Sequence, residues 1–141
     1  MHKTVLTIDD DTAITELLAM LLRTHGFEVS TANTGEEGIK AIKEINPHVV
    51  VLDLMMPGMD GWQVCKQVRA FSNVPIVILS ALDDPAMIAS ALDAGADDYL
   101  VKPVSSSILV AHLNRLIRRT GNLEAPGQLP VQRSNIQPMA S

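Results

Sequence analysis

Two continuous apolar runs constrain the fold of this chain more than any other feature. Residues 48–52 hold Val49 to Leu52 in succession, and residues 75–79 hold a second run, Pro-Ile-Val-Ile-Leu. A short run without polar alternation is typical of a strand buried on both faces of a parallel sheet. Such a sheet needs helices on both sides to cover it. The two runs therefore predict an α/β fold.

The sequence around these runs alternates between strand and helix patterns five times. Apolar, β-branched segments predict strands at residues 4–8, 27–32, 48–52, 75–79 and 99–101. Helical periodicity and capping residues predict helices at 14–22 (ended by Gly26), from Thr34 to before Pro47, at 62–70, from a cap at Asp83 or Asp84 to Gly95, and at 105–119. Short connections between the elements predict a doubly wound (βα)5 three-layer sandwich with a parallel five-stranded sheet. Periodicity alone leaves the strand order open.

The chain of 141 residues divides into two parts by composition. Residues 1–120 carry the strand and helix patterns and are long enough to bury a core without disulfides. Residues 121–141 contain scattered Pro and Gly among Gln, Asn and Ser, without any period. We expect one folded domain over residues 1–120 and a flexible linker or C-terminal tail over 121–141.

Composition excludes several functional classes. The net charge of −5 argues against direct nucleic-acid contact by this domain, which requires clustered Lys and Arg. Cys65 is the single cysteine, so the chain has no internal disulfide and no Cys-based metal site. No apolar run approaches the ~20 residues that span a bilayer, and no signal-peptide pattern precedes the first strand. We expect a cytoplasmic protein that makes no membrane contact.

Polar residues follow the ends of four predicted strands. Asp9-Asp10-Asp11 follow the first strand, Asp53 the third, Ser80 the fourth and Lys102-Pro103 the fifth. Because the carboxyl ends of parallel strands meet at one edge of a sheet, we expect these side chains to lie close together. Asp11 is the one of this set that we expect to cap the first helix instead.

The charges at this edge predict a cation site. Asp9, Asp10 and Asp53 would repel one another in a small crevice, and a divalent cation removes that repulsion. Oxygen ligands without nearby His or Cys favour Mg²⁺, with Mn²⁺ as an alternative. Lys102 adds an ammonium that can pair with Asp53 or a phosphoryl oxygen. A carboxylate in this setting is equipped to attack phosphorus, so we expect Asp53 to form an aspartyl phosphate whose oxygens Ser80 can hydrogen-bond.

Four motifs in this order resemble the receiver domains of two-component response regulators. They are Val5-Leu-Thr-Ile-Asp-Asp-Asp11, Val51-Leu-Asp-Leu-Met-Met-Pro-Gly-Met-Asp-Gly61, Ile78-Leu-Ser-Ala81 and Gly95-Ala-Asp-Asp-Tyr-Leu-Val-Lys-Pro103. The resemblance covers Thr4 to about Arg119. It implies a flavodoxin-like sheet of order 2-1-3-4-5. It also implies a switch protein rather than an enzyme, phosphorylated by a sensor histidine kinase or a small phosphodonor and assisting its own phosphorylation and dephosphorylation.

The resemblance assigns roles to individual positions. Asp53 is the expected phosphoacceptor, and Lys102 and Ser80 are expected to assist its chemistry. Asp10 and Asp53 are expected to bind the metal directly, Asp9 through water, and Met55 through its backbone carbonyl. Ser80 and Tyr99 are the expected switch residues, and the Lys102–Pro103 bond is expected to be cis.

The resemblance also implies an output surface, formed by the helix after Asp84, the strand at 99–101 and the helix at 105–119. We expect Met87, Ala91, Asp97, Asp98, His112 and Arg115 to face a partner there, which is an output domain, an effector protein or a second copy of the chain. The sequence from Gly95 to Pro103 is similar to receivers of the winged-helix DNA-binding class, but Ile108, His112 and Asn114 stand where that class has Glu, Arg and Lys.

The helix before Gly95 leads to a more specific expectation. Its spacing puts Ile88, Ala89 and Leu92 on a core face and leaves Met87, Ala91 and Ala94 exposed. Exposed apolar side chains favour a partner interface with few charges.

Four alternative functions compete with this interpretation. An aspartyl phosphatase or phosphotransferase would need a second acid two residues after the nucleophile, where this chain has Met55. A flavin-binding module would need a Ser/Thr/Gly-rich phosphate loop in place of Asp9-Asp10-Asp11. The chain is alternatively a stand-alone receiver that acts by protein–protein interaction, or a scaffold that is never phosphorylated.

Overall fold

The two apolar runs form the central strands of a five-stranded parallel sheet. The computed structural model describes residues 2–123. In chain order its elements are β1 (Thr4–Ile8), α1 (Thr12–Thr24), β2 (Glu28–Ala32), α2 (Gly35–Ile45), β3 (Val49–Leu52), α3 (Gly61–Arg69), β4 (Ile76–Ser80), α4 (Pro85–Ala94), β5 (Asp98–Val101) and α5 (Ser106–Leu123). The strands lie in the order β2-β1-β3-β4-β5, all parallel. This arrangement confirms the doubly wound fold and the order 2-1-3-4-5.

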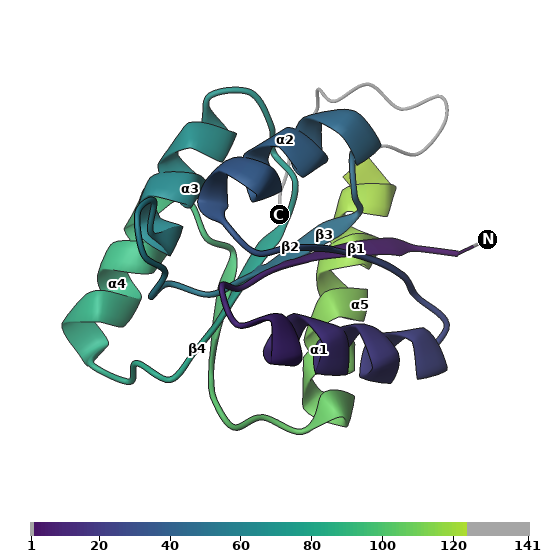
Figure 1. Cartoon of the computed structure of the whole chain (residues 1–141). Helices are drawn as coiled ribbons and strands as arrows, with labels where there is room; N and C mark the ends of the chain where they lie inside the picture. Colours follow the sequence, from purple (N-terminus) through teal and green to yellow (C-terminus); the bar gives the residue numbers. More distant parts are fainter. Residues whose placement is uncertain (1, 124–141) are drawn as a thin grey trace.

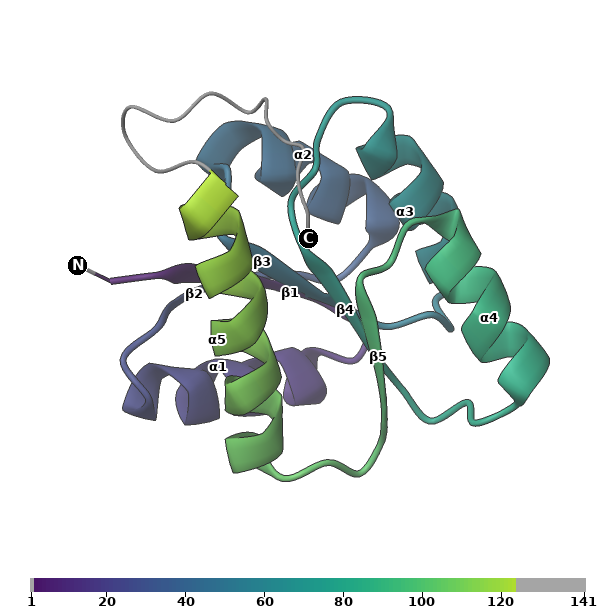
Figure 2. The same ribbon diagram turned by 180° about the vertical axis from the view of Figure 1, so that it is seen from behind.

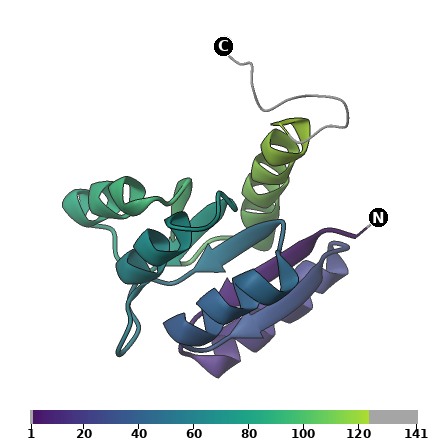
Figure 3. The ribbon, with the colours of Figure 1, turned by 90° about the horizontal axis from the view of Figure 1, so that it is seen from above.

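Helices cover both faces of the sheet. The strand residues that point to one face pack against α2, α3 and α4, and those that point to the other face pack against α1 and α5. Figures 1 and 2 show α1 and α5 close together, across the sheet from α2 and α3. From above, α3 (teal) and α4 (green) lie side by side, away from α5 (yellow-green; Figure 3). All residues of β3 and β4 are buried, as their apolar sequences predict.

Local signals place most helix ends where the sequence predicts them. Thr34 caps α2 by accepting from the Glu37 N–H, and Asp84, the second of the two predicted residues, caps α4 ahead of Pro85. A capping box of Asp60 and Gln63 begins α3. The last helix is longer than the predicted 105–119 and ends at Leu123. The remaining residues of the predicted tail, 124–141, lie outside the described part of the chain.

The structure corrects the predicted core face of α4. Ala91 is fully buried, whereas Met87 and Leu92 are 45% and 42% exposed. Ala91 and Ala94 pack into the hydrophobic core cluster to which side chains of α3 also contribute, whereas Ala89 is exposed. Small side chains on this face let α4 approach α3 closely. Ala91 is therefore a core residue and does not belong to the predicted partner surface.

Among the helices of residues 2–123, none combines the length and apolarity that crossing a bilayer requires.

Candidate functional site

Strand register brings the predicted site residues to one edge of the sheet. Ile8 pairs with Leu52, and Leu52 pairs with Ile78, so Asp9 and Asp53 follow neighbouring strands at the same level. Ser80 is the last residue of β4 and pairs with Val101, directly before Lys102. The predicted convergence of these side chains is therefore confirmed for the acidic residues, the serine and the lysine.

Three carboxylates form a compact cluster. Asp9, Asp10 and Asp53 each offer an oxygen, and these oxygens lie within 4.8 Å of one another. Asp9 and Asp53 are only 5% and 9% exposed, whereas Asp10 lies at the surface. Oxygen atoms at this spacing, open to solvent on the Asp10 side, fit a hard divalent cation that retains water ligands.

Electrostatics make this cluster costly without a cation. Burial raises the pKa of the Asp53 carboxyl above its ordinary value, and the neighbouring charge of Asp9 raises it further. Lys102 and the backbone N–H groups of Met55 and Leu54 act in the opposite direction, since they stabilise the carboxylate. The net effect is an upward shift, so the chain's own groups only partly compensate the negative charge on Asp53.

The loop after β1 is held by a small network of hydrogen bonds. Asp9 accepts the Asp11 N–H at 3.0 Å, and Asp11 caps α1 by accepting the N–H groups of Ala13 and Ile14. The Asn33 amide donates to the Asp9 backbone carbonyl at 2.8 Å and to the buried hydroxyl of Thr15 at 3.2 Å. The expected capping role of Asp11 is confirmed, and the network fixes the backbone next to Asp10.

Lys102 pairs with a different carboxylate from the one expected. Its ammonium nitrogen lies 3.1 Å from Asp9 Oδ2, and within residues 2–123 it forms no ion pair with Asp53. The Lys102–Pro103 peptide bond is cis, as predicted. The ammonium therefore pairs with Asp9, which is the most deeply buried of the three clustered carboxylates.

The side chains of Ser80 and Tyr99 both form hydrogen bonds with the backbone of Leu82. The Ser80 hydroxyl accepts the Leu82 N–H at 3.3 Å, and the Tyr99 hydroxyl donates to the Leu82 carbonyl at 2.7 Å. Burial of the Tyr99 ring raises the pKa of its hydroxyl, so the fold favours the protonated form that donates this bond. A movement of Ser80 toward Asp53 would release one of the two hydrogen bonds at Leu82. The two predicted switch residues therefore share a backbone contact at Leu82.

Two residues near the site were missed by sequence reasoning. One is Asn33, which resembles an ordinary turn residue before the Thr34 cap. The other is Gly61, where a Cβ atom would lie 2.5 Å from the Asp53 carbonyl oxygen and 2.7 Å from the Leu54 Cα. The position of Gly61 at the start of a helix gives no sign of this close approach. The approach depends on how the helix packs against the residues that follow β3.

The predicted partner surface is largely paired within the chain. Asp97 bonds Arg69 of α3 at 2.9 Å and also accepts the Ile76 N–H. Asp98 accepts hydrogen bonds from His112 and, at 2.7 Å, from Arg115. In contrast, four large apolar side chains are substantially exposed on α4, on β5 and on the part of α5 up to residue 120: Met87, Leu92, Val101 and Ile108.

Comparisons with known proteins agree on one family. The sequence profile of the response regulator receiver domain matches residues 5–114. The DNA-binding response regulator MtrA of Mycolicibacterium paratuberculosis is 40% identical over 129 residues, which are 92% of this chain and 56% of MtrA. The transcriptional regulatory protein AfsQ1 of Streptomyces coelicolor is 42% identical over 115 residues, 82% of this chain and 51% of that protein. The chain thus spans about half the length of these curated relatives.

Solved structures show the same similarity in three dimensions. The receiver domain of the Francisella response regulator 1452 superposes with a TM-score of 0.80 at 37% identity. The superposition covers 84% of this chain and 99% of that domain.

Proposed function

The chain belongs to the response regulator receiver domain family, and we propose that it is a phosphorylation-dependent switch whose phosphoacceptor is Asp53. The observation that carries the proposal is the cluster of Asp9, Asp10 and Asp53 oxygens within 4.8 Å, with Lys102 beside it. Three carboxylates held this close repel one another, and a cation and a phosphoryl-transfer role account for that arrangement where a scaffold role does not.

In the proposed reaction, a carboxylate oxygen of Asp53 attacks the phosphorus of a phosphohistidine on a sensor kinase, or of a small phosphodonor. The new O–P bond forms as the bond from phosphorus to the donor's leaving group breaks, and the leaving group takes that electron pair. Lys102 and the Ser80 hydroxyl hold phosphoryl oxygens. The chain acts as a reactant that assists its own phosphorylation and dephosphorylation, and not as an enzyme that turns over a substrate.

A divalent cation completes the proposed site. Asp10 and Asp53 would bind Mg²⁺ or Mn²⁺ directly, Asp9 through water and Met55 through its backbone carbonyl, and the ion would supply charge stabilisation for the transferring phosphoryl group. The chain's own part is to hold the Asp9–Asp10 backbone in place through Asn33 and the cap of α1.

The switch follows from the contacts at Leu82. When Ser80 turns toward the phosphoryl group it releases the Leu82 N–H, and Tyr99 is left as the side-chain bond to that loop. The loop leads into α4, so its movement repacks the surface of α4, β5 and α5. Through this surface the domain would control an output domain or partner in the cytoplasm.

The proposed output is transcription through a winged-helix DNA-binding domain, because the match covers only about half of each curated relative described above and one of them is named a DNA-binding response regulator. Nucleic acid would then be contacted by that domain and not by this one. Since Asp97 and Asp98 are paired within the chain, homodimerisation would use the apolar side chains of Met87, Val101 and Ile108 more than charges.

The test is intact-mass spectrometry after incubation with acetyl phosphate and Mg²⁺, with Asp53→Asn treated in parallel. We expect a gain of one phosphoryl mass in the wild type, its loss when the metal is chelated, and no gain in the variant. The absence of a gain in the wild-type protein would overturn the proposal and leave a receiver-shaped scaffold.

A further inference from the structure

The carboxylate of Asp98 connects α5 to the backbone of Tyr99. Asp98 is the first residue of β5, the edge strand that lies between α4 and α5 (Figure 2). Its Oδ1 accepts the Tyr99 backbone N–H at 2.9 Å. Its Oδ2 accepts hydrogen bonds from His112 and Arg115, which both belong to α5. One side chain therefore holds the last helix and the predicted switch residue together.

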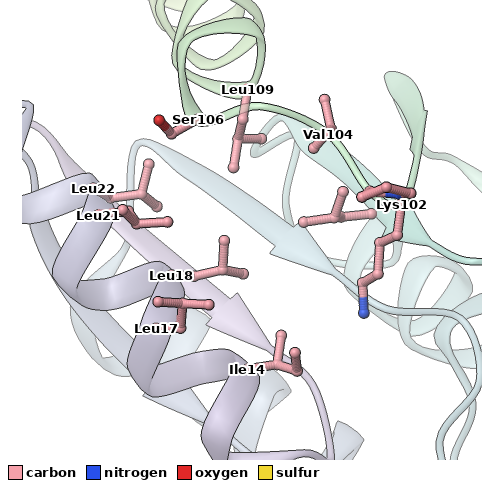
Figure 4. A pocket seen from close by; sticks show the side chains of 11 residues that line it. Ile14, Leu17, Leu18, Leu21, Leu22, Lys102, Val104, Ser106 and Leu109 are labelled. Atoms are coloured by element: carbon pink, nitrogen blue, oxygen red, sulfur yellow. The ribbon is translucent and has the colours of Figure 1, made fainter.

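The inner side of α5 is held in a different way, by apolar packing. Leu109, Leu113 and Leu116 are buried in the core cluster that α5 shares with α1 and the sheet. Figure 4 shows Leu109 together with leucines of α1 around a half-open apolar pocket. Apolar packing is non-directional and involves no titrating group. A change of charge can therefore strengthen or weaken the connection at Asp98 without altering this packing.

Two charged groups face His112. Asp98 comes from β5, and Arg115, whose Nη2 lies 3.4 Å from His112 Nδ1, comes from α5 itself. Over residues 2–123, the other charged residues on the elements around α5 form no hydrogen bond or ion pair with His112: Glu16 and Arg23 of α1, Glu28 of β2, Asp93 of α4, and Arg118 and Arg119 of α5. The charge of this cluster is therefore zero with a neutral His112 and +1 with a protonated one.

The bond to Asp98 determines where the proton is added. Because the carboxylate accepts, His112 Nδ1 carries a hydrogen in either charge state, and a further proton adds to Nε2. A neutral imidazole then becomes an imidazolium, and its bond to Asp98 becomes a charge-assisted one, which is roughly twice as strong as a neutral bond. Histidine side chains change charge in this way between about pH 5 and 8.

We propose that His112 is a positioning residue for Tyr99, and that its protonation tightens the connection between α5 and β5 and so favours the unphosphorylated arrangement of the domain. The strengthening of the Asp98–His112 pair by acid does not depend on the proposed function. Its effect on phosphorylation rests on that function.

Tyr99 connects the Asp98 cluster to the phosphorylation site. Its backbone N–H is bound to Asp98, and its hydroxyl donates to the Leu82 carbonyl, on the loop that the Ser80 hydroxyl also contacts. If Ser80 turns toward a phosphoryl group and Tyr99 moves with this loop, the bond to Asp98 is disturbed. A more firmly held Asp98 opposes that movement, so acid lowers the affinity of the site for a phosphoryl group.

The pair itself is tested by a double-mutant cycle of Asp98→Asn and His112→Asn in urea unfolding, at about pH 8 and about pH 5.5. Asparagine at 112 offers a neutral donor that does not titrate. We expect the coupling between the two positions, as a factor in the unfolding equilibrium constant, to rise at least about threefold at the lower pH. The matched control is His25→Asn, because His25 caps the end of α1 and contacts the Leu21 carbonyl.

A second measurement covers the case in which Asp98→Asn does not fold. In NMR spectra of the wild type, the Tyr99 amide should shift with pH together with the His112 ring, and this shift should be lost in His112→Asn. Equal coupling at both pH values, or a Tyr99 amide that shifts identically in His112→Asn, would overturn the role of His112.

The effect on the switch is tested with the full chain, Mg²⁺ and beryllium trifluoride, an analogue of the phosphoryl group. We expect wild type and His112→Asn to bind the analogue equally at about pH 8, and the wild type to bind at least about threefold more weakly at about pH 6. His112→Arg, whose charge does not titrate, should bind more weakly than His112→Asn at both pH values. Comparing variants at one pH cancels the titration of Asp53, which they share.

The outcomes separate this inference from the proposed function. A ratio of wild-type to His112→Asn affinity that stays constant with pH, in proteins that bind the analogue, would refute the coupling to phosphorylation alone. Failure of the wild type to bind the analogue or to gain a phosphoryl group would refute the proposed function and leave the acid-strengthened Asp98–His112 pair standing.

Discussion

The ammonium of Lys102 lies 3.1 Å from the carboxylate of Asp9, although the two residues are 93 positions apart in the chain. This ion pair joins the residue after β1 to the residue after β5, so the ammonium is bound to Asp9 and not to Asp53. A phosphoryl group on Asp53 would compete with Asp9 for the same ammonium. The unphosphorylated state is thus held by a specific contact that phosphorylation would weaken, which is what a two-state switch requires.

Neutralising Asp53 should stabilise the protein in metal-free buffer. The pKa of Asp53 is raised in the fold, so its charged form is disfavoured by folding, and Asp53→Asn removes that charge. We expect the free energy of unfolding in urea to rise by about 1–2 kcal/mol at neutral pH. Asp93→Asn, on the exposed side of α4, is the control. Added Mg²⁺ should stabilise the wild type and shrink the difference. A less stable Asp53→Asn would contradict the like-charge account of the site.

Removing the Asn33 amide should weaken both the fold and the metal site. Asn33→Ala deletes the bonds to the Asp9 carbonyl and to Thr15, so we expect a loss of about 1–2 kcal/mol in chemical denaturation. Because the Asp9–Asp10 backbone loses its anchor, Mg²⁺ affinity measured by calorimetry should fall as well. Asn114→Ala, exposed on α5, should change neither quantity. Unaltered Mg²⁺ affinity in Asn33→Ala would limit Asn33 to a role in stability.

Gly61→Ala should disturb Asp53 directly. The new Cβ meets backbone atoms of Asp53 and Leu54, which cannot move without displacing the Asp53 side chain. We expect a destabilisation of about 1–3 kcal/mol and slower phosphorylation by acetyl phosphate. In Gly38→Ala the Cβ meets the end of the Ile8 side chain at 2.4 Å, and a helix interior favours Ala over Gly. Its phosphorylation rate should stay close to the wild-type rate; similar rates in both variants would argue against a special role for Gly61.

Cys65 should be unreactive in the folded protein. It is fully buried in α3, and burial raises the pKa of its thiol to about 11. The reactive thiolate is therefore both scarce and inaccessible at neutral pH. We expect labelling by a disulfide reagent only at urea concentrations that unfold the chain. Fast labelling in native buffer would show that α3 opens locally.

The fold and most of the site follow from local sequence signals. The buried runs at β3 and β4, the caps at Thr34 and Asp84, and the Asp, Ser and Lys residues at strand ends are each recognisable within a few residues. Parallel pairing then places every strand end at the same edge, so the convergence of Asp9, Asp53, Ser80 and Lys102 needs no long-range information beyond the topology.

The orientation of α4 shows where local signals end. Periodicity groups Ile88 with Leu92 and, equally well, with Ala91, because both spacings return to one side of a helix. Packing against α3 decides between them, since only small side chains permit the close approach that buries Ala91. The more apolar residue, Leu92, is left exposed.

Local sequence patterns suffice to predict which residues lie at the carboxyl edge of the sheet, whereas the packing of strands and helices sets which of those residues are in contact. The pairing of Lys102 with Asp9, the anchoring of the Asp9 carbonyl by Asn33 and the close approach of Gly61 to Asp53 join segments that are distant in the chain. Distances of this kind depend on how strands twist and helices pack, and a local sequence pattern carries no information about either.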